Sequence, residues 1–369
     1  MYSDVSTEWV EKHSDYLAPE GFVEISLYIP QVQQTLTYTK NDLMSFTHQQ
    51  TGSLLSGELP KNHIEFSLDN SDGNWNPSHP KGLARYLSER LKLTLRYGFD
   101  IDGVMEWIPG GVFYLSEWHT PSNGLEASFK ARDLLEFMMD KLYTGEVSGT
   151  LYELAERAVA EAGIPSDATV SLCEELKNYN VGAIEYEGNE SVAVILQRCA
   201  NAACCVMYQN RDGVLVIERA NNTDCGYVVT NGISYSYPEI EYSRPLKSVS
   251  VSYVNKGKVS LIYNTSGETQ TVTNEFISTE AQAIEVARWA CEALRTRKTI
   301  SGDFRGDPRL DVFDVIQVES KYGTITDVVL TDIKYTFTGA FRANYSGHIQ
   351  GSGTPVVIYS GEIYSGEVS

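Results

Sequence analysis

Hydrophobic side chains alternate with polar ones through much of the first third of the chain. This alternation of every second position, typical of strands with one buried face, runs through residues 22–29, 63–70, 91–98, 111–118 and 125–131. Stretches rich in Gly, Pro, Asn and Asp separate these segments and have the composition of turns. The pattern predicts antiparallel strands with one short helix near 81–90. We expect a β-barrel or sandwich domain over residues 22–140.

The periodicity becomes helical after this first β region. Thr150 and Glu153 have the spacing of a capping box at the start of an apolar stripe that repeats every three to four residues. A second helix is expected over 191–203, followed by a hairpin over 205–219. These elements predict a small α+β connector module over residues 141–239.

Strand-like alternation returns in the last third of the chain. Residues 247–264 predict a hairpin, and residues 278–298 predict an amphipathic helix. Further strands are expected at about 299–305, 313–319, 325–338 and 341–350. Residues 240–350 are therefore predicted to form a second barrel-like unit, which makes the chain mainly β with an α+β insert between two antiparallel β-barrel domains.

Both ends of the chain lie outside these patterns. Residues 1–21 are predicted to be a polar arm, which lacks the basic start and apolar run of a signal peptide. Residues 351–369 are a C-terminal tail in which the pentapeptide from Tyr359 is echoed from Tyr364. Two such copies are too short to bury a core, so the tail either frays or pairs with a neighbouring chain. The two tyrosines are candidates for contacts between subunits.

Length and charge narrow the classes of protein that fit. A chain of 369 residues suggests two or three domains. The net charge is -20, with 49 acidic against 29 basic residues, which disfavours direct binding of nucleic acid. The acidic balance suits a large soluble assembly, and it also suits a surface along which DNA slides without adhering. No window approaches 18 apolar residues, so no membrane span is expected.

The sequence contains no recognisable catalytic, cofactor-binding or metal-binding motif. The sequence has no HExxH, GxSxG or Walker motif, and no CxxC pair occurs among its six cysteines. Its histidines are scattered along the chain. Asn70, Asp72 and Asn74 alternate as in a calcium loop, but Trp75 replaces the glycine of the sharp turn and Lys81 the bidentate glutamate. We interpret this stretch as turns held by Asx side chains. No enzyme activity, cofactor or metal is expected.

Four aromatic residues lie beside turns of the first β region: Trp75, Trp107, Tyr114 and Trp118. They would suit a platform on which sugars stack. Packing in the core and at its rim is the interpretation that we favour, because aromatic side chains in a unit of this size supply much of its buried area. The carbohydrate hypothesis stays open as an alternative.

The segment 64–138 resembles the first domain of bacteriophage tail baseplate hub proteins of the gp27-like family, whose longer relatives are tail-associated lysins. The resemblance rests on the turn "LDNSDG", the strands that lead into "GVFYLSEW", and the closing strand with "ARDLL". The later element "GDPRLDVFDVIQV" also looks like this family. In order along the chain, the resemblance extends over about residues 20–350.

The resemblance implies two tube-like barrels per chain and a homotrimeric, pseudo-hexameric ring between the hexameric tail tube and the trimeric tail tip. It implies a virion protein of the tail tip or baseplate, assembled in the host cytoplasm, whose channel passes the tape-measure protein and then DNA during genome ejection. Its partners would be a distal tail or tail tube protein and tail-tip or receptor-binding proteins. Because the chain ends at residue 369, no lysozyme or peptidase domain is expected. The alternative is a tail-tip protein that binds cell wall or receptor, with weak wall-hydrolase activity.

The tripeptide Arg305-Gly306-Asp307 is known from cell adhesion, and Asp311 follows close behind it as a possible cation ligand. Bacterial targets carry no integrins, and the aspartates lack the spacing of a calcium loop. Gly306 and Pro308 instead favour a turn that leads into a strand near Val315. Arg305 and Asp307 are then candidates for contacts between subunits.

Overall fold

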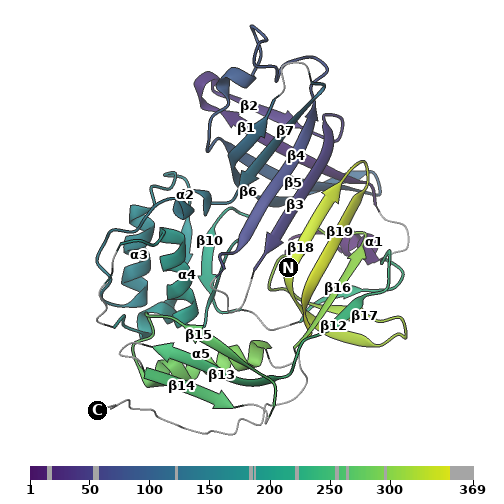
Figure 1. Ribbon diagram of the computed structural model, residues 1–369. Helices are drawn as coiled ribbons and strands as arrows, with labels where there is room; N and C mark the ends of the chain where they lie inside the picture. Colours follow the sequence, from purple (N-terminus) through teal and green to yellow (C-terminus); the bar gives the residue numbers. More distant parts are fainter. Residues whose placement is uncertain are drawn as a thin grey trace, which may run out of the picture.

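Strands of both β regions join in one large sheet, as a computed structural model shows (Figure 1). The structure describes residues 1–14, 19–52, 58–120, 124–182, 186, 188–220, 224–253, 257–262, 266–294 and 297–349. Along its main path the sheet has the order β12-β16-β19-β18-β3-β4-β7-β6-β5-β1-β2, and β17 and β11 extend it from β18. The mainly β composition expected from the sequence is confirmed.

The first β region supplies seven strands of this sheet. They are β1 (Gly21–Ile29), β2 (Gln34–Tyr38), β3 (Leu43–Thr51), β4 (Lys61–Asp69), β5 (Lys92–Ile101), β6 (Val104–His119) and β7 (Glu126–Arg132). Short 3-10 helices occupy Pro30–Val32 and Ala84–Tyr86, the second within the segment where a short helix was predicted. Burial alternates along β1, where Val23, Ile25 and Leu27 point into the core. The strict alternation in the sequence therefore predicted β1, β4, β5, β6 and β7 correctly, whereas β2 and β3 were not predicted.

The last part of the chain supplies the other strands. They are β11 (Asp224–Val229), β12 (Glu239–Tyr242), β16 (Lys298–Phe304), β17 (Val315–Glu319), β18 (Ile325–Phe337) and β19 (Phe341–Ile349). The two regions meet where β3 pairs antiparallel with β18, with Phe46 opposite Phe337 and His48 opposite Tyr335. This pairing joins residues almost 290 positions apart in the sequence. It makes one continuous sheet out of two β regions.

The connector contains α2 (Glu136–Met139), α3 (Leu151–Glu161), β8 (Val170–Leu172), the 3-10 helix η3 (Glu174–Asn178), α4 (Val192–Ala202), β9 (Val206–Gln209) and β10 (Leu215–Glu218). The predicted capping box is present: the Thr150 hydroxyl accepts a hydrogen bond from the Glu153 amide, and the Glu153 carboxylate accepts one from the Thr150 amide. Strand β10 lies between β8 and β9. The helices cover one side of this small sheet (Figure 1).

A third sheet lies at the far end from the first β region (Figure 1). It consists of β13 (Leu246–Tyr253), β14 (Gly257–Ile262) and β15 (Glu268–Thr273), and helix α5 (Glu280–Leu294) packs on it. In the predicted hairpin, Val249 lies opposite Leu261 and Val251 opposite Val259.

These elements pack around two hydrophobic cores. One core joins the strands of the first β region with those of the last, and the other joins the connector helices with β13, β14 and α5. Residues 246–294, which the sequence analysis placed in the second barrel, therefore share a core with the connector. The boundaries at residues 140 and 239 themselves stay predictions.

The N-terminal arm contains a helix that the sequence analysis did not predict, α1 (Thr7–Ser14). Its Trp9 is fully buried, stacks on His13 and meets the edge of Phe99 at 5.0 Å between ring centroids. A helix of about two turns with one large buried apolar residue gives no periodic signal in a sequence. Among the described residues, no helix has the length and apolar character needed to cross a bilayer.

Candidate interaction surface

The turn that contains Arg305-Gly306-Asp307 lies inside the molecule. The Asp307 carboxylate is fully buried and accepts hydrogen bonds from Arg309, at 2.6 Å from Nη2 and 3.0 Å from Nε. Gly306 has a φ of 85°, which a residue with a side chain rarely adopts, and so permits the tight turn. Strand β17 begins at Val315, as predicted. The interpretation of this stretch as a turn before a strand is confirmed.

Burial alone would raise the pKa of Asp307, but neighbouring His13 and Arg309 outweigh it and hold that pKa below its usual value. Burial also lowers the pKa of His13, so at neutral pH the Arg309 guanidinium is the compensating charge. With its carboxylate engaged inside the chain, Asp307 offers no surface to another subunit, and its assignment as a subunit contact is wrong. Arg305 donates to the His13 carbonyl at 3.2 Å and stays a predicted contact. Tyr359 and Tyr364 lie outside the described residues.

A second buried ion pair connects the connector with both β regions. Arg211, in the hairpin between β9 and β10, donates to both carboxylate oxygens of Asp311 at 2.7 and 2.8 Å. The same guanidinium donates to the carbonyls of Leu310 and Pro109, while Gln50 of β3 donates to Asp311 at 3.1 Å. Asp311 is therefore an anchor for Arg211 and not a cation ligand. Across the described ranges, no three His, Cys, Asp or Glu side chains gather into a metal site.

The other candidate cation loop is also held by its own backbone. Asn70 accepts from the Trp75 amide at 2.8 Å, and Asp72 accepts from the Asn74 amide at 2.9 Å. Asp69 accepts from the Ser71 amide at 2.9 Å in the same way. The contacts of Asp69 and Asp72 are Asx turns, as predicted, and Asn70 closes a wider loop onto Trp75.

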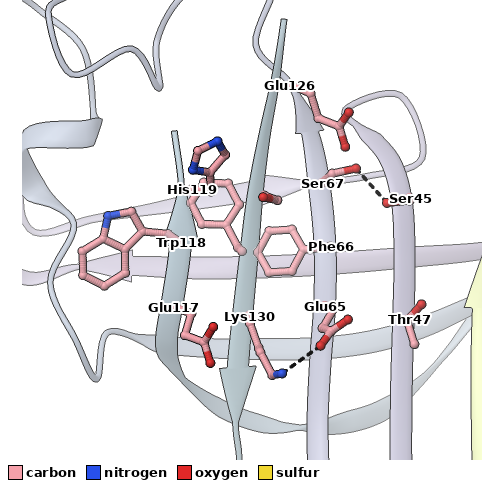
Figure 2. A pocket seen from close by; sticks show the side chains of 12 residues that line it. Ser45, Thr47, Glu65, Phe66, Ser67, Glu117, Trp118, His119, Glu126 and Lys130 are labelled. Atoms are coloured by element: carbon pink, nitrogen blue, oxygen red, sulfur yellow. Dashed lines mark hydrogen bonds and ion pairs between the residues drawn. The ribbon is translucent and has the colours of Figure 1, made fainter. Parts of the chain in front are cut away.

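A groove of about 380 Å³ crosses the face of β3, β4, β7 and β6 (Figure 2). Its lining combines the rings of Trp118, Phe66 and Phe129 with polar side chains: Ser45, Thr47, Glu65, Ser67, Glu117, His119, Glu126, Ser128 and Lys130. Trp118 is 36% exposed. The groove can hold a small polar molecule or an extended chain against one aromatic ring.

Glu65 of the groove does not suit acid catalysis. Lys130 donates to Glu65 at 3.0 Å, and this hydrogen bond lowers the pKa of Glu65. A general acid would need a raised pKa to be protonated near neutral pH.

The predicted alternative of a platform of four aromatic rings is wrong. Trp75 and Tyr114 are buried, with 3% exposure each, and pack against Phe129 and Phe137. The guanidinium of Arg96 lies 4.3 Å above the ring of Trp107 and covers it. Of the four, Trp118 reaches the groove.

A larger cavity of about 630 Å³ lies where the first β region meets the connector, between the ends of β4 and β7 and helices α2 and α4. The Asp133 carboxylate at its wall is 3% exposed and accepts from the Leu135 amide at 3.1 Å. Burial raises the pKa of Asp133 to about 7.

The folded-state pKa of Asp133 lies above its value of 3.8 in water. Ionisation of this buried carboxyl therefore lowers the free energy of unfolding as the pH rises from about 4 to about 7. We expect Asp133→Asn, which keeps an acceptor for Leu135, to raise the free energy of unfolding by about 2 kcal/mol at about pH 8 and by little at about pH 4. Urea unfolding at both pH values measures this difference. Asp140→Asn, an exposed change of the same charge, is the control. An equal gain at both pH values would refute the role of Asp133.

The ends of the large sheet are exposed. Strand β12 pairs with β16 on one side and ends the sheet there, and β2 ends it on the other side. What we call the tyrosine surface consists of Tyr242 in β12, Tyr235 and Tyr237 shortly before it, and Tyr322, next to Lys321, which lies near Tyr237; their exposures are 73%, 51%, 54% and 89%. Large exposed side chains beside an unpaired strand edge are typical of contact surfaces.

This tyrosine surface was not predicted from the sequence. The stretch "SYSYPEIEY" could have indicated this surface, because its tyrosines recur without the apolar partners that a core strand would have. Lys321 lies 5.6 Å from the ring of Tyr237, and Arg342 lies 4.6 Å from that of Tyr235. Such cation–π contacts restrict the orientation of these two rings at the surface.

No protein family profile matches the sequence, and no curated protein matches it significantly. Solved structures do match. A tail protein from Neisseria meningitidis superposes with a TM-score of 0.60 at 14% identity, covering 88% of this chain and 96% of that one. The 43 kDa tail protein of prophage MuSo2 from Shewanella oneidensis gives 0.61 at 15% identity, covering 88% and 98%.

The prophage tail protein gp18 from Listeria monocytogenes gives a TM-score of 0.55 at 12% identity, covering 89% of this chain and 95% of that one. Three such matches run through nearly the whole length of each chain. The likeness therefore extends over the β regions and the connector together. The chain has the fold of phage tail proteins.

Proposed function

We propose that this chain is a structural hub protein of a phage or phage-like tail, located at the tail tip or baseplate of the virion. The observation that carries the proposal is the likeness in fold to three tail proteins over 88–89% of the chain. Fold alone is compatible with several functions. The proposal therefore also draws on the sheet edges, the charge and the groove.

In this proposal three chains form a ring, and each contributes two barrel-like units. The pairing of β3 with β18 sets the two β regions side by side within a chain. The free edges β2 and β12 would join neighbouring chains in the same manner, since an exposed edge is a template for pairing. Six similar units from three chains would match a six-fold tube on one side and a three-fold tip on the other.

The proposed ring would enclose the channel for the tape-measure protein and then for DNA. The net charge of -20 supports this role, because acidic walls repel phosphates and DNA passes without adhering. The neighbours along the tail would be a tail tube or distal tail protein above and tail-tip or receptor-binding proteins below. We propose no enzymatic role, in line with the lowered pKa of Glu65 in the groove.

The mass of the purified chain in solution tests this proposal. We expect a species of three times the 41.1 kDa chain mass. Ile240→Asp, at a 40% exposed position of β12, should weaken the trimer about tenfold through charge repulsion beside Glu239 and Glu241. Val104→Asp, at a 63% exposed position in the first β region, is the matched control and should leave the trimer intact.

A monomer at all concentrations, combined with clearing of host cell wall in a zymogram, would overturn the hub in favour of a tail-tip wall-binding protein with hydrolase activity. The groove around Trp118 would then be the place to look for the ligand. Trp118→Ala should have no effect on the trimer if the hub proposal holds, because the groove lies away from β2 and β12.

A further inference from the structure

Two cysteine thiols of the connector lie in contact. Cys173 follows β8 and Cys205 precedes β9, and their sulfur atoms are 3.5 Å apart. Both are held by backbone hydrogen bonds: the Cys173 amide donates to the Ile217 carbonyl at 3.1 Å, and the Cys205 amide donates to the Ala200 carbonyl at 2.8 Å. Their separation is larger than the sulfur–sulfur bond of about 2.05 Å. The two sulfurs would have to approach by about 1.5 Å to form the bond.

The two thiols differ in access to solvent. Cys205 is fully buried, whereas Cys173 is partly exposed beside the 3-10 helix η3. The hydrogen bond that the thiols share lowers the pKa of Cys173, against the opposing effects of burial and of Glu175. The same hydrogen bond, together with burial, raises the pKa of Cys205. Cys173 is thus the more accessible of the two sulfurs and the one whose ionisation the shared hydrogen bond favours.

We propose that Cys173 and Cys205 are a redox-active pair that forms a disulfide by exchange with a low-molecular-weight disulfide such as oxidised glutathione. The Cys173 thiolate attacks one sulfur of the small disulfide, which breaks its S–S bond and releases one glutathione thiolate. The Cys205 thiol then loses its proton and attacks the Cys173 sulfur, releasing the second glutathione. Two protein thiols are oxidised and one small disulfide is reduced to two thiols.

The remaining cysteines occupy different surroundings. Cys199 and Cys291 are buried in helices α4 and α5, and Cys225 lies in β11 of the large sheet. Cys204 precedes Cys205 directly and has a φ of 58°, in the left-handed region. Burial raises the pKa of Cys204 to about 12, and the sulfur that lies 3.5 Å from Cys205 is that of Cys173. The geometry therefore selects Cys173 as the partner of Cys205.

The bond would close a loop of the chain that runs from Cys173 to Cys205 and contains helix α4 of the connector. Such a cross-link restricts opening of the loop that it closes. The inference does not depend on the proposed hub. If the hub proposal holds, the protein passes from a reducing cytosol to an oxidising exterior, and the bond would form on that passage.

The test uses the full chain incubated with oxidised glutathione, then alkylated and digested without reduction for mass spectrometry. We expect a linked peptide that contains Cys173 and Cys205, and a fall from six free thiols to four that dithiothreitol reverses. Six thiols that persist, a bond between Cys204 and Cys205, or a bond between two chains would each overturn the proposal. The wild-type protein suffices for this test.

Three variants refine it. Cys205→Ser should trap a single glutathionyl group on Cys173, whereas Cys173→Ser should take up none and form no bond. Cys225→Ser, a change at another partly exposed cysteine, is the matched control and should still form the bond. Trapping of glutathione on Cys204 or Cys225 in the Cys205→Ser variant would contradict the assignment of Cys173 as the attacking sulfur.

Discussion

Asp307→Ala is expected to lower the free energy of unfolding by about 3–5 kcal/mol, because it leaves the Arg309 guanidinium buried without its carboxylate. Arg309 is 3% exposed, and the Asp307 carboxylate accepts three of its side-chain hydrogen bonds at 2.6–3.0 Å. Tyr335 donates to the Asp307 and Leu310 carbonyls at 2.9 and 2.7 Å, so the turn is also fixed to β18. Chemical denaturation measures the loss.

Two further variants separate charge from packing in this prediction. Asp327→Ala, at an exposed position of β18, should change stability by less than about 0.5 kcal/mol. The double variant Asp307→Leu/Arg309→Met removes both charges and should recover most of the loss, since apolar pairs often replace buried ion pairs without cost. If Asp307→Ala costs no more than Asp327→Ala, the pair contributes nothing to the fold.

Asp311→Ala should have a similar effect, about 3–5 kcal/mol, because Arg211 then stays buried among the three parts of the chain that it connects. Arg211 is 7% exposed, and its guanidinium has no other carboxylate among the hydrogen bonds described for it. Arg211→Met should cost less, since Asp311 is closer to solvent, with a side-chain exposure of 20%, and keeps the hydrogen bond from Gln50.

Hydrogen exchange locates this effect. In Asp311→Ala, amides of the hairpin between β9 and β10 should exchange faster, because the hairpin loses its anchor on the β regions. Asp212→Ala, at the exposed neighbour of Arg211, is the control and should leave exchange and stability unchanged. Equal costs for Asp311→Ala and Arg211→Met would contradict the argument from burial.

Much of the fold could be predicted from local pattern. Strict alternation found β1 and β5, the pair Thr150 and Glu153 found the start of α3, and Gly306 with Pro308 found the turn before β17. Each of these signals acts over a few residues, where sterics and backbone hydrogen bonding dominate. They identify elements but not which elements pair.

The long-range arrangement has no such signal. The pairing of β3 with β18 spans almost 290 positions, and β13 packs with the connector although it follows residue 240. The burial of Asp307 was also not predicted, because the tripeptide resembled a surface motif. Its partner Arg309 is two residues further on, and a turn brings such a pair to one side. The cavity beside Asp133 and the tyrosine surface likewise depend on tertiary contacts.

The central claim is that three copies of this chain form a ring around a channel. Electron microscopy of the purified full-length protein tests it most directly. We predict ring-shaped particles with three-fold symmetry, six similar lobes around the rim and a central opening, and we predict that Ile240→Asp reduces their number while Val104→Asp does not. Particles of a single chain with no ring at any concentration, or closed oligomers without a central opening, would contradict the proposal.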